Sequence, residues 1–377
     1  ALASSRADAD AFIVSRLRQA GAVILGKVNL SEWANFMTSA SANGFSTVGG
    51  HTRNPYGRFD VGGSSSGSAV AVAAGFAPLT VGTETAGSLV YPASQNAVVT
   101  LKPSVGLISR DRIIPITDRQ DTAGPMARTV REAALLAGVL SGLDAADPIT
   151  AQAEQISAID YTAFLDVDAL RGVRVAVVSR EEVYREGDAA IVEAVIARLT
   201  AAGAEVVTVP PLEMRIDYLP ILFYGFHAGV NHYLQTVAQN TPVRTIEELI
   251  AFNAADMDNR APFGQDLIER ALTYELTTEE QADYDQTAES NRETAGAMIR
   301  EVLNTHNAAI MVDLSNYSTA IYAPAGFPAV TLPAGYRETG EPIGVTLIGD
   351  YLDDPRLLAY AYALEQVEPV RRPPPLD

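Results

Sequence analysis

Cysteine is absent from the 377-residue sequence, and histidine occurs only four times. The lack of cysteine excludes disulfides, thiolate metal sites and cysteine nucleophiles together. The four histidines form no grouping with Asp or Glu at the spacing of metal ligands. We therefore expect a protein without a metal or another cofactor.

Positive charge and long apolar runs are also in short supply. The sequence has 27 Lys+Arg against 46 Asp+Glu, a formal net charge of -19. A field of that sign repels phosphate groups, so neither nucleic acid nor an anionic membrane is an expected partner. The longest apolar runs, such as residues 69–74, are far too short to span a bilayer. No signal peptide opens the chain.

Alternating patterns of strands and helices indicate an α/β protein. Strand, helix and strand patterns follow one another over residues 173–178, 188–201 and 204–209, which favours a sheet covered by helices. Further expected elements are a helix over 7–20, strands over 22–26, 77–83 and 98–101, a mostly helical stretch over 213–307, strands over 310–312, 329–332 and 343–348, and a helix over 355–366. No linker separates the strand-rich ends, so we predict one domain over residues 1–370 and a Pro-rich tail over 371–377.

The segment GGSSSGS at residues 62–68 allows three interpretations. One is a flexible Gly/Ser linker, which is weakened because a helical pattern follows directly. Another is a phosphate-binding loop, but the GxxxxGK[ST] pattern is missing. The third is a nucleophile elbow, G-x-S-x-G, with Ser65 as nucleophile. That motif requires a strand before it, and residues 54–60 form a turn sequence instead.

The segment GTETAGS at residues 82–88 has different chemistry. A strand ends at Gly82, and small residues then lead to Ser88. Such a turn can direct several backbone N–H groups at one point, which is what an oxyanion hole requires. An ordinary strand-to-loop turn is the alternative.

Together these segments resemble the amidase signature family, and the resemblance covers essentially the whole chain. The matching motifs are GKVN at 26–29, NP at 54–55, the segments 62–68 and 82–88, PA at 92–93, LKP at 101–103, GPMAR at 124–128, and the C-terminal segments 327–335 and 344–349. Residues 223–234 and 262–266 resemble the branch that contains bacterial peptide amidases. The resemblance implies a single large mixed β-sheet covered by helices on both faces.

The resemblance also implies an amide hydrolase with a Ser–cis-Ser–Lys triad that works through an acyl-enzyme. Ser88 matches the nucleophile, and Ser64 matches the bridging serine, whose preceding peptide is cis in the family. The backbone amides of Thr85, Ala86 and Gly87, together with that of Ser88, match the oxyanion hole. Ala34 and Asp121 fall where the family borders its substrate, and an N-cap or loop-bracing role is the alternative for Asp121. The family usually has glycine at the position of Ala86 and aspartate at that of Glu84.

The base lysine of the family lies further before the Gly/Ser loop than the 63 residues available here. Lys27 belongs to the separate GKVN motif, and Lys102 belongs to the LKP motif, so neither matches the base. We expect the base upstream of this chain, near-inactivity of the 377 residues alone, and exposure of residues 22–25. The alternative is a catalytically impaired or non-catalytic binding protein on the same scaffold.

Partners and location follow from the same reasoning. A small-molecule amide with an apolar or aromatic acyl group is the expected substrate, because Tyr and Phe are frequent in residues 213–307. The alternative is that these aromatic side chains belong to the core. The expected location is cytoplasmic, with secretion left open because the true N-terminus is missing. The sequence makes no prediction of the oligomeric state.

Overall fold

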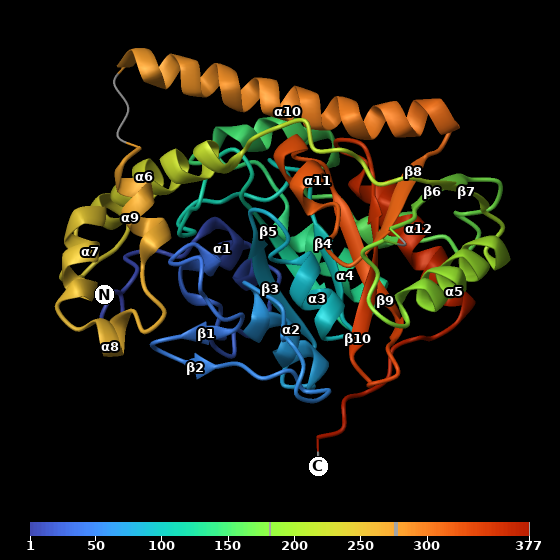
Figure 1. Ribbon diagram of the computed structural model, residues 1–377, viewed down its shortest axis with the longest axis horizontal. Coiled ribbons are helices and arrows are strands. Elements are labelled where there is room, and N and C mark those ends of the chain that lie inside the picture. The colour runs from blue at the N-terminus through green and yellow to red at the C-terminus, as the bar shows by residue number, and fades with distance from the viewer. Residues whose placement is uncertain (181, 275–277, 377) are drawn as a thin grey trace.

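The computed structural model describes residues 1–180, 182–274 and 278–376 and contains one dominant mixed sheet (Figure 1). In this part of the chain eight strands join in the order β3-β5-β4-β9-β10-β8-β6-β7. Their bounds are Leu79–Glu84 (β3), Val99–Lys102 (β4), Thr122–Ala127 (β5), Arg174–Val178 (β6), Glu205–Val209 (β7), Ile310–Leu314 (β8), Ala329–Tyr336 (β9) and Pro342–Ile348 (β10). Pairings from β3 to β8 are antiparallel, and β6 is parallel to both β8 and β7. The predicted mixed α/β sheet is confirmed.

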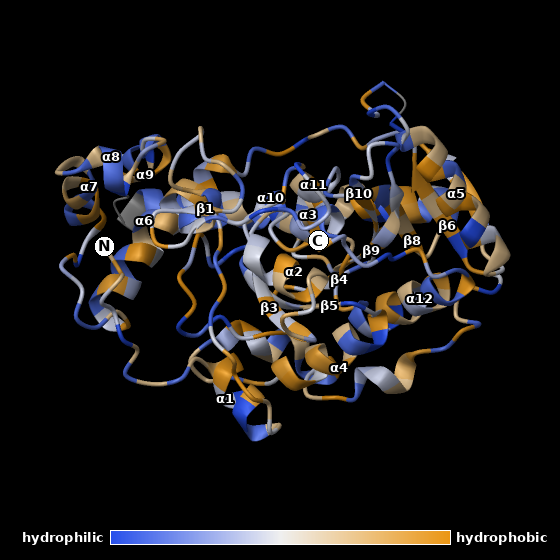
Figure 2. Cartoon of the chain, turned by 90° about the horizontal axis from the view of Figure 1, so that it is seen from below, coloured by the Kyte–Doolittle hydropathy of each residue, from blue (hydrophilic) through white to orange (hydrophobic). Residues whose placement is uncertain are grey.

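Helices cover both faces of this sheet. One face carries α2 (Ser66–Ala73), α3 (Val90–Gln95), α10 (Thr278–His306) and α11 (Thr319–Ala325), and the other carries α1 (Phe12–Gln19), α4 (Val130–Leu140), α5 (Asp188–Ala201) and α12 (Asp354–Val367). Figure 2 shows α3 and α11 on one side of the strands and α4 and α12 on the other. Short 3₁₀ helices occupy Glu32–Asn35, Pro148–Ile156 and Tyr161–Phe164, and β1 (Phe45–Ser46) pairs with β2 (Gly50–His51) outside the main sheet.

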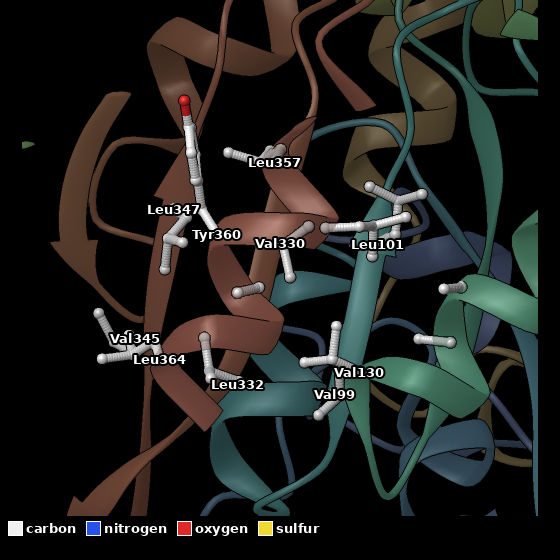
Figure 3. Close-up of a cluster of buried hydrophobic side chains, with 14 of the residues drawn as sticks. Val99, Leu101, Val130, Val330, Leu332, Val345, Leu347, Leu357, Tyr360 and Leu364 are labelled. Atoms are coloured by element: carbon white, nitrogen blue, oxygen red, sulfur yellow. The ribbon is translucent and has the colours of Figure 1, made fainter. Parts of the chain in front are cut away.

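The main core lies between the sheet and the α4–α12 layer (Figure 3). Side chains of a strand alternate between faces, so Val99 and Leu101 point to this core while Thr100 and Lys102 point to the opposite face. Helix α4 starts where it does because Thr129 and Glu132 form a capping box: the Thr129 hydroxyl accepts from the Glu132 N–H, and the Glu132 carboxylate accepts from the Thr129 N–H. These local signals fix how α4 lies on the sheet.

A helical group stands beside one end of the sheet and forms its own apolar cluster. It consists of α6 (Leu219–Thr236), α7 (Ile246–Ala254), α8 (Met257–Arg260) and α9 (Asp266–Leu272), and Figure 1 shows α10 running from this group across the molecule. A β-carbon on Gly225 of α6 would lie 2.6 Å from the Thr117 side chain. The glycine therefore allows the segment before β5 to lie directly against α6.

The strands differ from the prediction at two places. Residues 22–26 form no strand, and no described strand pairs with this segment. Its apolar side chains are exposed, as expected, with Val23 at 82% and Leu25 at 74%. Strand β5 was not predicted, because Gly124 and Pro125 interrupt its pattern. At the other end, Arg371 and Arg372 of the Pro-rich tail bond to Ala73 and Tyr336.

Candidate active site

Ser88 lies on the short loop that joins β3 to α3. Gly87 adopts φ +90, a left-handed conformation that disfavours any side chain. In the described part of the chain, no atom accepts a hydrogen bond from the main-chain N–H groups of Thr85, Ala86, Gly87 and Ser88. Four consecutive free donors that end at a hydroxyl match the requirement for an oxyanion hole. We call residues 85–88 the oxyanion loop.

Glu84, which is buried at the end of β3, holds the residues that follow the oxyanion loop. One of its carboxylate oxygens accepts from the N–H groups of Leu89 (2.8 Å) and Val90 (3.1 Å). These are donors at the start of α3, and a carboxylate is favourable there because of the helix dipole. Glu84 thus fixes where the strand stops and the helix begins, with Ser88 between them.

Ser64 lies in the loop that leads into α2, and this loop touches the oxyanion loop. The Ser65 N–H donates to the Ser88 carbonyl at 3.2 Å. The peptide bond between Gly63 and Ser64 is cis, the configuration that the resemblance implies at this position. The Ser64 side chain is fully buried, and its hydroxyl has no hydrogen-bond partner among the described residues. Its neighbour Ser88 is 9% exposed.

Several side chains brace the Ser64 loop. Asp60 accepts from the Gly62 N–H at 2.8 Å and from the Tyr91 hydroxyl at 3.0 Å, which connects the loop to α3. Asn96, just after α3, donates to the Val61 carbonyl at 2.8 Å. These contacts hold the two serine-bearing loops together, and neither Asp60 nor Tyr91 was among the predicted site residues.

Ser65, the rival nucleophile, is engaged otherwise. Its hydroxyl donates to the Thr83 carbonyl (2.9 Å) and accepts from the Thr83 N–H (3.0 Å). No strand precedes it, and His227 and His232 lie on α6. The geometry therefore fits a structural bridge between α2 and β3 and does not fit a nucleophile elbow.

A cavity of about 440 Å³ opens beside the oxyanion loop. Ala34, Thr85 and Asp121 all line it, so three predicted residues meet there, whereas Ser64 and Ser88 are not among its lining. Its walls come from residues 110–119, from α6 and from α10, with Tyr224, Tyr233 and Tyr284 among them. More of the lining is apolar than polar, which suits an apolar acyl group.

Asp121 acts as a brace within this wall. One carboxylate oxygen accepts from the Thr85 hydroxyl at 2.5 Å, and the other accepts from the N–H groups of Ile116 (2.8 Å) and Thr117 (2.9 Å). Burial raises the pKa of the Asp121 carboxyl to about 6, although these three donors pull in the opposite direction. The loop-bracing role explains all of its contacts.

The sequence contains two lysines, Lys27 and Lys102. Lys27 is exposed, and the Lys102 ammonium is buried and donates to the Phe327 carbonyl at 2.7 Å. Burial lowers the pKa of Lys102 to about 8, against the opposing effect of Glu84 and Asp354. Lys102 thus ties β4 to the residues before β9.

Comparison with known proteins decides the family. The Amidase family model matches residues 1–358. The chain belongs to the amidase family. An amidase family protein from Bacillus anthracis superposes with a TM-score of 0.93 at 40% identity, covering 98% of this chain and 73% of that one. The native peptide amidase from Stenotrophomonas maltophilia gives a TM-score of 0.91 at 41% identity, covering 99% and 79%.

A curated amidase relative supports the same conclusion. The chain is 35% identical over 387 residues to a protein described as a probable amidase from Arabidopsis thaliana, covering 99% of this chain and 73% of that protein. This chain is therefore an amide hydrolase, and it has the amidase signature fold. No helix within its described residues is both long and apolar enough to cross a membrane.

Proposed function

We propose that this amidase hydrolyses small carboxylic amides through an acyl-enzyme on Ser88, with Ser64 as the proton relay. The observation that carries the proposal is the set of four unbonded N–H groups in the oxyanion loop, directly before and at Ser88. Backbone donors of this kind stabilise the negative charge that develops when a carbonyl is attacked. The backbone hydrogen bond between Ser65 and Ser88 holds the loop of Ser64 against the oxyanion loop. This contact supports a short path for a proton from the Ser88 hydroxyl to the Ser64 hydroxyl.

In this mechanism the Ser88 oxygen attacks the amide carbonyl carbon and passes its proton to the Ser64 oxygen. Ser64 in turn gives its own proton to a base. The carbonyl oxygen becomes an oxyanion, which the amides of residues 85–88 stabilise. When the C–N bond breaks, the relay returns a proton to the leaving amine, and water then hydrolyses the ester on Ser88.

The base in this proposal is a lysine outside residues 1–377. The buried, unpartnered Ser64 hydroxyl supports a role as proton relay, and the positions of Lys27 and Lys102 argue against either as base. Loss of one triad member typically costs several orders of magnitude in rate, with residual activity from the oxyanion hole. We therefore expect an N-terminally extended form to turn over an aryl amide at least about 1,000-fold faster than the 377-residue chain.

The substrate proposed for this site is a neutral amide with an apolar or aromatic acyl side. One solved peptide amidase is in complex with the competitive inhibitor chymostatin, and its chain superposes on this one with a TM-score of 0.90 at 40% identity. The tyrosines and isoleucines that line the cavity support an acyl group of that character.

Active-site labelling tests the nucleophile. We expect a fluorophosphonate probe to modify Ser88 in the full-length protein, as located by peptide mapping, and Ser88→Ala to abolish both labelling and amide hydrolysis. Ser64→Ala should slow the labelling, but the label should still be found on Ser88. A label on Ser65 would support the nucleophile-elbow interpretation instead. Absence of any label in an extended form that carries the lysine would support the non-catalytic binding protein.

A further inference from the structure

Two neighbouring residues hold Thr85 by its side chain and by its main chain. The Gln120 side-chain amide donates to the Thr85 carbonyl at 3.2 Å, and Asp121 accepts from the Thr85 hydroxyl at 2.5 Å. A carbonyl only accepts hydrogen bonds, so the Gln120 atom involved is its nitrogen. Gln120 is 2% exposed, which leaves little room for water to replace it.

The bond to the Thr85 carbonyl has a consequence for the next donor along the chain. The Thr85 carbonyl and the Ala86 N–H belong to one planar trans peptide group, in which C=O and N–H point in opposite directions. Gln120 therefore fixes the Ala86 N–H on the side away from itself. A rotation of this peptide would direct the carbonyl oxygen, a negative dipole, to the place where a donor is needed.

The sheet places Gln120 where it can do this. Thr122 of β5 pairs with Glu84 of β3, so the residues just before β5 run beside the residues just after β3. The other oxygen of Asp121 holds the N–H groups of Ile116 and Thr117. Gln120 thus belongs to a segment that other hydrogen bonds hold in place.

We propose that Gln120 is a positioning residue that orients the peptide between Thr85 and Ala86 so that the Ala86 N–H can serve the oxyanion hole. This inference rests on the proposed function of the oxyanion loop. It assigns to Gln120 no contact with the substrate, so its effect falls on transition-state stabilisation and not on substrate binding.

Gln120→Met in the active full-length enzyme tests the proposal, because methionine keeps the length and volume of glutamine but has no N–H donor. Removal of one oxyanion-hole donor lowers kcat by about 100- to 1,000-fold. We expect a smaller loss of about 10- to 100-fold here, because the Ala86 N–H is still present and only loses its fixed orientation. KM should change by less than about threefold, because ground-state contacts are unaltered.

A second readout separates positioning from general damage. An aldehyde analogue of the substrate forms a tetrahedral oxyanion adduct with the nucleophile, whereas the corresponding alcohol does not. We expect Gln120→Met to lower the affinity for the aldehyde in proportion to its loss of kcat/KM. The affinity for the alcohol should stay unchanged. Gln120→Glu, which also removes the amide donor, should show the same pattern and serves if the methionine variant does not fold.

Gln265→Met is the matched control. Gln265 is also buried, and it bonds with Asn253 and Glu269 within the helical group, remote from the oxyanion loop in sequence and in its contacts. Gln265→Met should lower the melting temperature but leave kcat and the affinity for the aldehyde unchanged. Unchanged kcat in Gln120→Met, or a lower kcat with unaltered aldehyde affinity, would overturn the inference. Amide hydrolysis by Ser88→Ala would instead overturn the proposed function itself.

Discussion

Gly87 shows at the scale of one residue how backbone conformation and chemistry are coupled. Its φ of +90 turns the chain from β3 toward α3 and leaves the neighbouring N–H groups unbonded. A β-carbon there would lie 3.2 Å from the Asn316 side-chain nitrogen. The site therefore depends on a residue without a side chain at this position.

We predict that Gly87→Ala lowers kcat by at least about tenfold, because relief of the left-handed strain would rotate the donors of the oxyanion loop. The backbone strain itself costs roughly 1–2 kcal/mol of folding free energy. Gly75→Ala is the control, since Gly75 has φ +80 and nothing within 4 Å of its would-be β-carbon. Equal activity losses in both variants, measured with one amide substrate, would refute the role given to Gly87.

The site residues that the sequence offered belong to contiguous segments. Residues 85–88 were named for the chemistry of their turn, and Ser64 was named because its segment resembles that of the amidase signature family. Gln120 could not be named, because its role depends on the register of β5 against β3, and Gly124 and Pro125 hide β5 from any pattern of alternation. The same holds for Tyr91, whose partner Asp60 lies 31 positions away.

At the scale of elements, the contact between α4 and α12 contains a partly buried acid. Glu365 of α12 accepts from the Val130 N–H at 2.8 Å, at the start of α4. Burial raises its pKa to about 7, with Glu132 adding to the effect and the bond to Val130 opposing it. The folded protein therefore holds this proton more tightly than the unfolded chain, whose carboxyl has a pKa near 4.5.

Stability should consequently fall as the pH rises from about 4.5 to about 7, because the folded state holds the charged carboxylate in a partly buried position. Glu365→Gln keeps an acceptor for Val130 but removes the charge. We predict that this variant is more stable than the parent at pH 8 by on the order of 1–3 kcal/mol, and nearly equal to it at pH 4.5. Urea unfolding at both pH values measures this, and a difference independent of pH would contradict it.

The elements themselves were largely predictable where their patterns are long. The strand–helix–strand unit over β6, α5 and β7 and the C-terminal strands appear where the sequence predicts them. Residues 22–26 show the limit of such prediction: an apolar run has strand character, but a strand exists only where a neighbour supplies a ladder. That information is not contained in the run.

At the scale of the whole molecule, the sheet and the helical group contribute different things to the site. The sheet ends position both serine loops, whereas α6, α10 and residues 110–119 form most of the cavity wall. The surrounding charge is strongly negative, with a net value of -19. The long-range field should thus act on substrate approach and leave the bonded geometry of the loops unaffected.

We predict that an amide carrying a carboxylate has a higher KM than a neutral amide of equal size at low salt, because the protein repels it. The gap should narrow as added salt shortens the screening length to about 8–10 Å. KM for both substrates at two ionic strengths measures the effect, with the neutral amide as control. A ratio of the two KM values that does not respond to salt would contradict it.

The oxyanion loop consists of peptide groups, while the wall facing the cavity consists largely of side chains. A peptide N–H survives every substitution except proline. Directed evolution can therefore exchange Tyr224, Ala228 or His232 on α6 without deleting a donor. A library restricted to those three positions is a direct way to retune the acyl preference of this scaffold while its reactive chemistry stays in place.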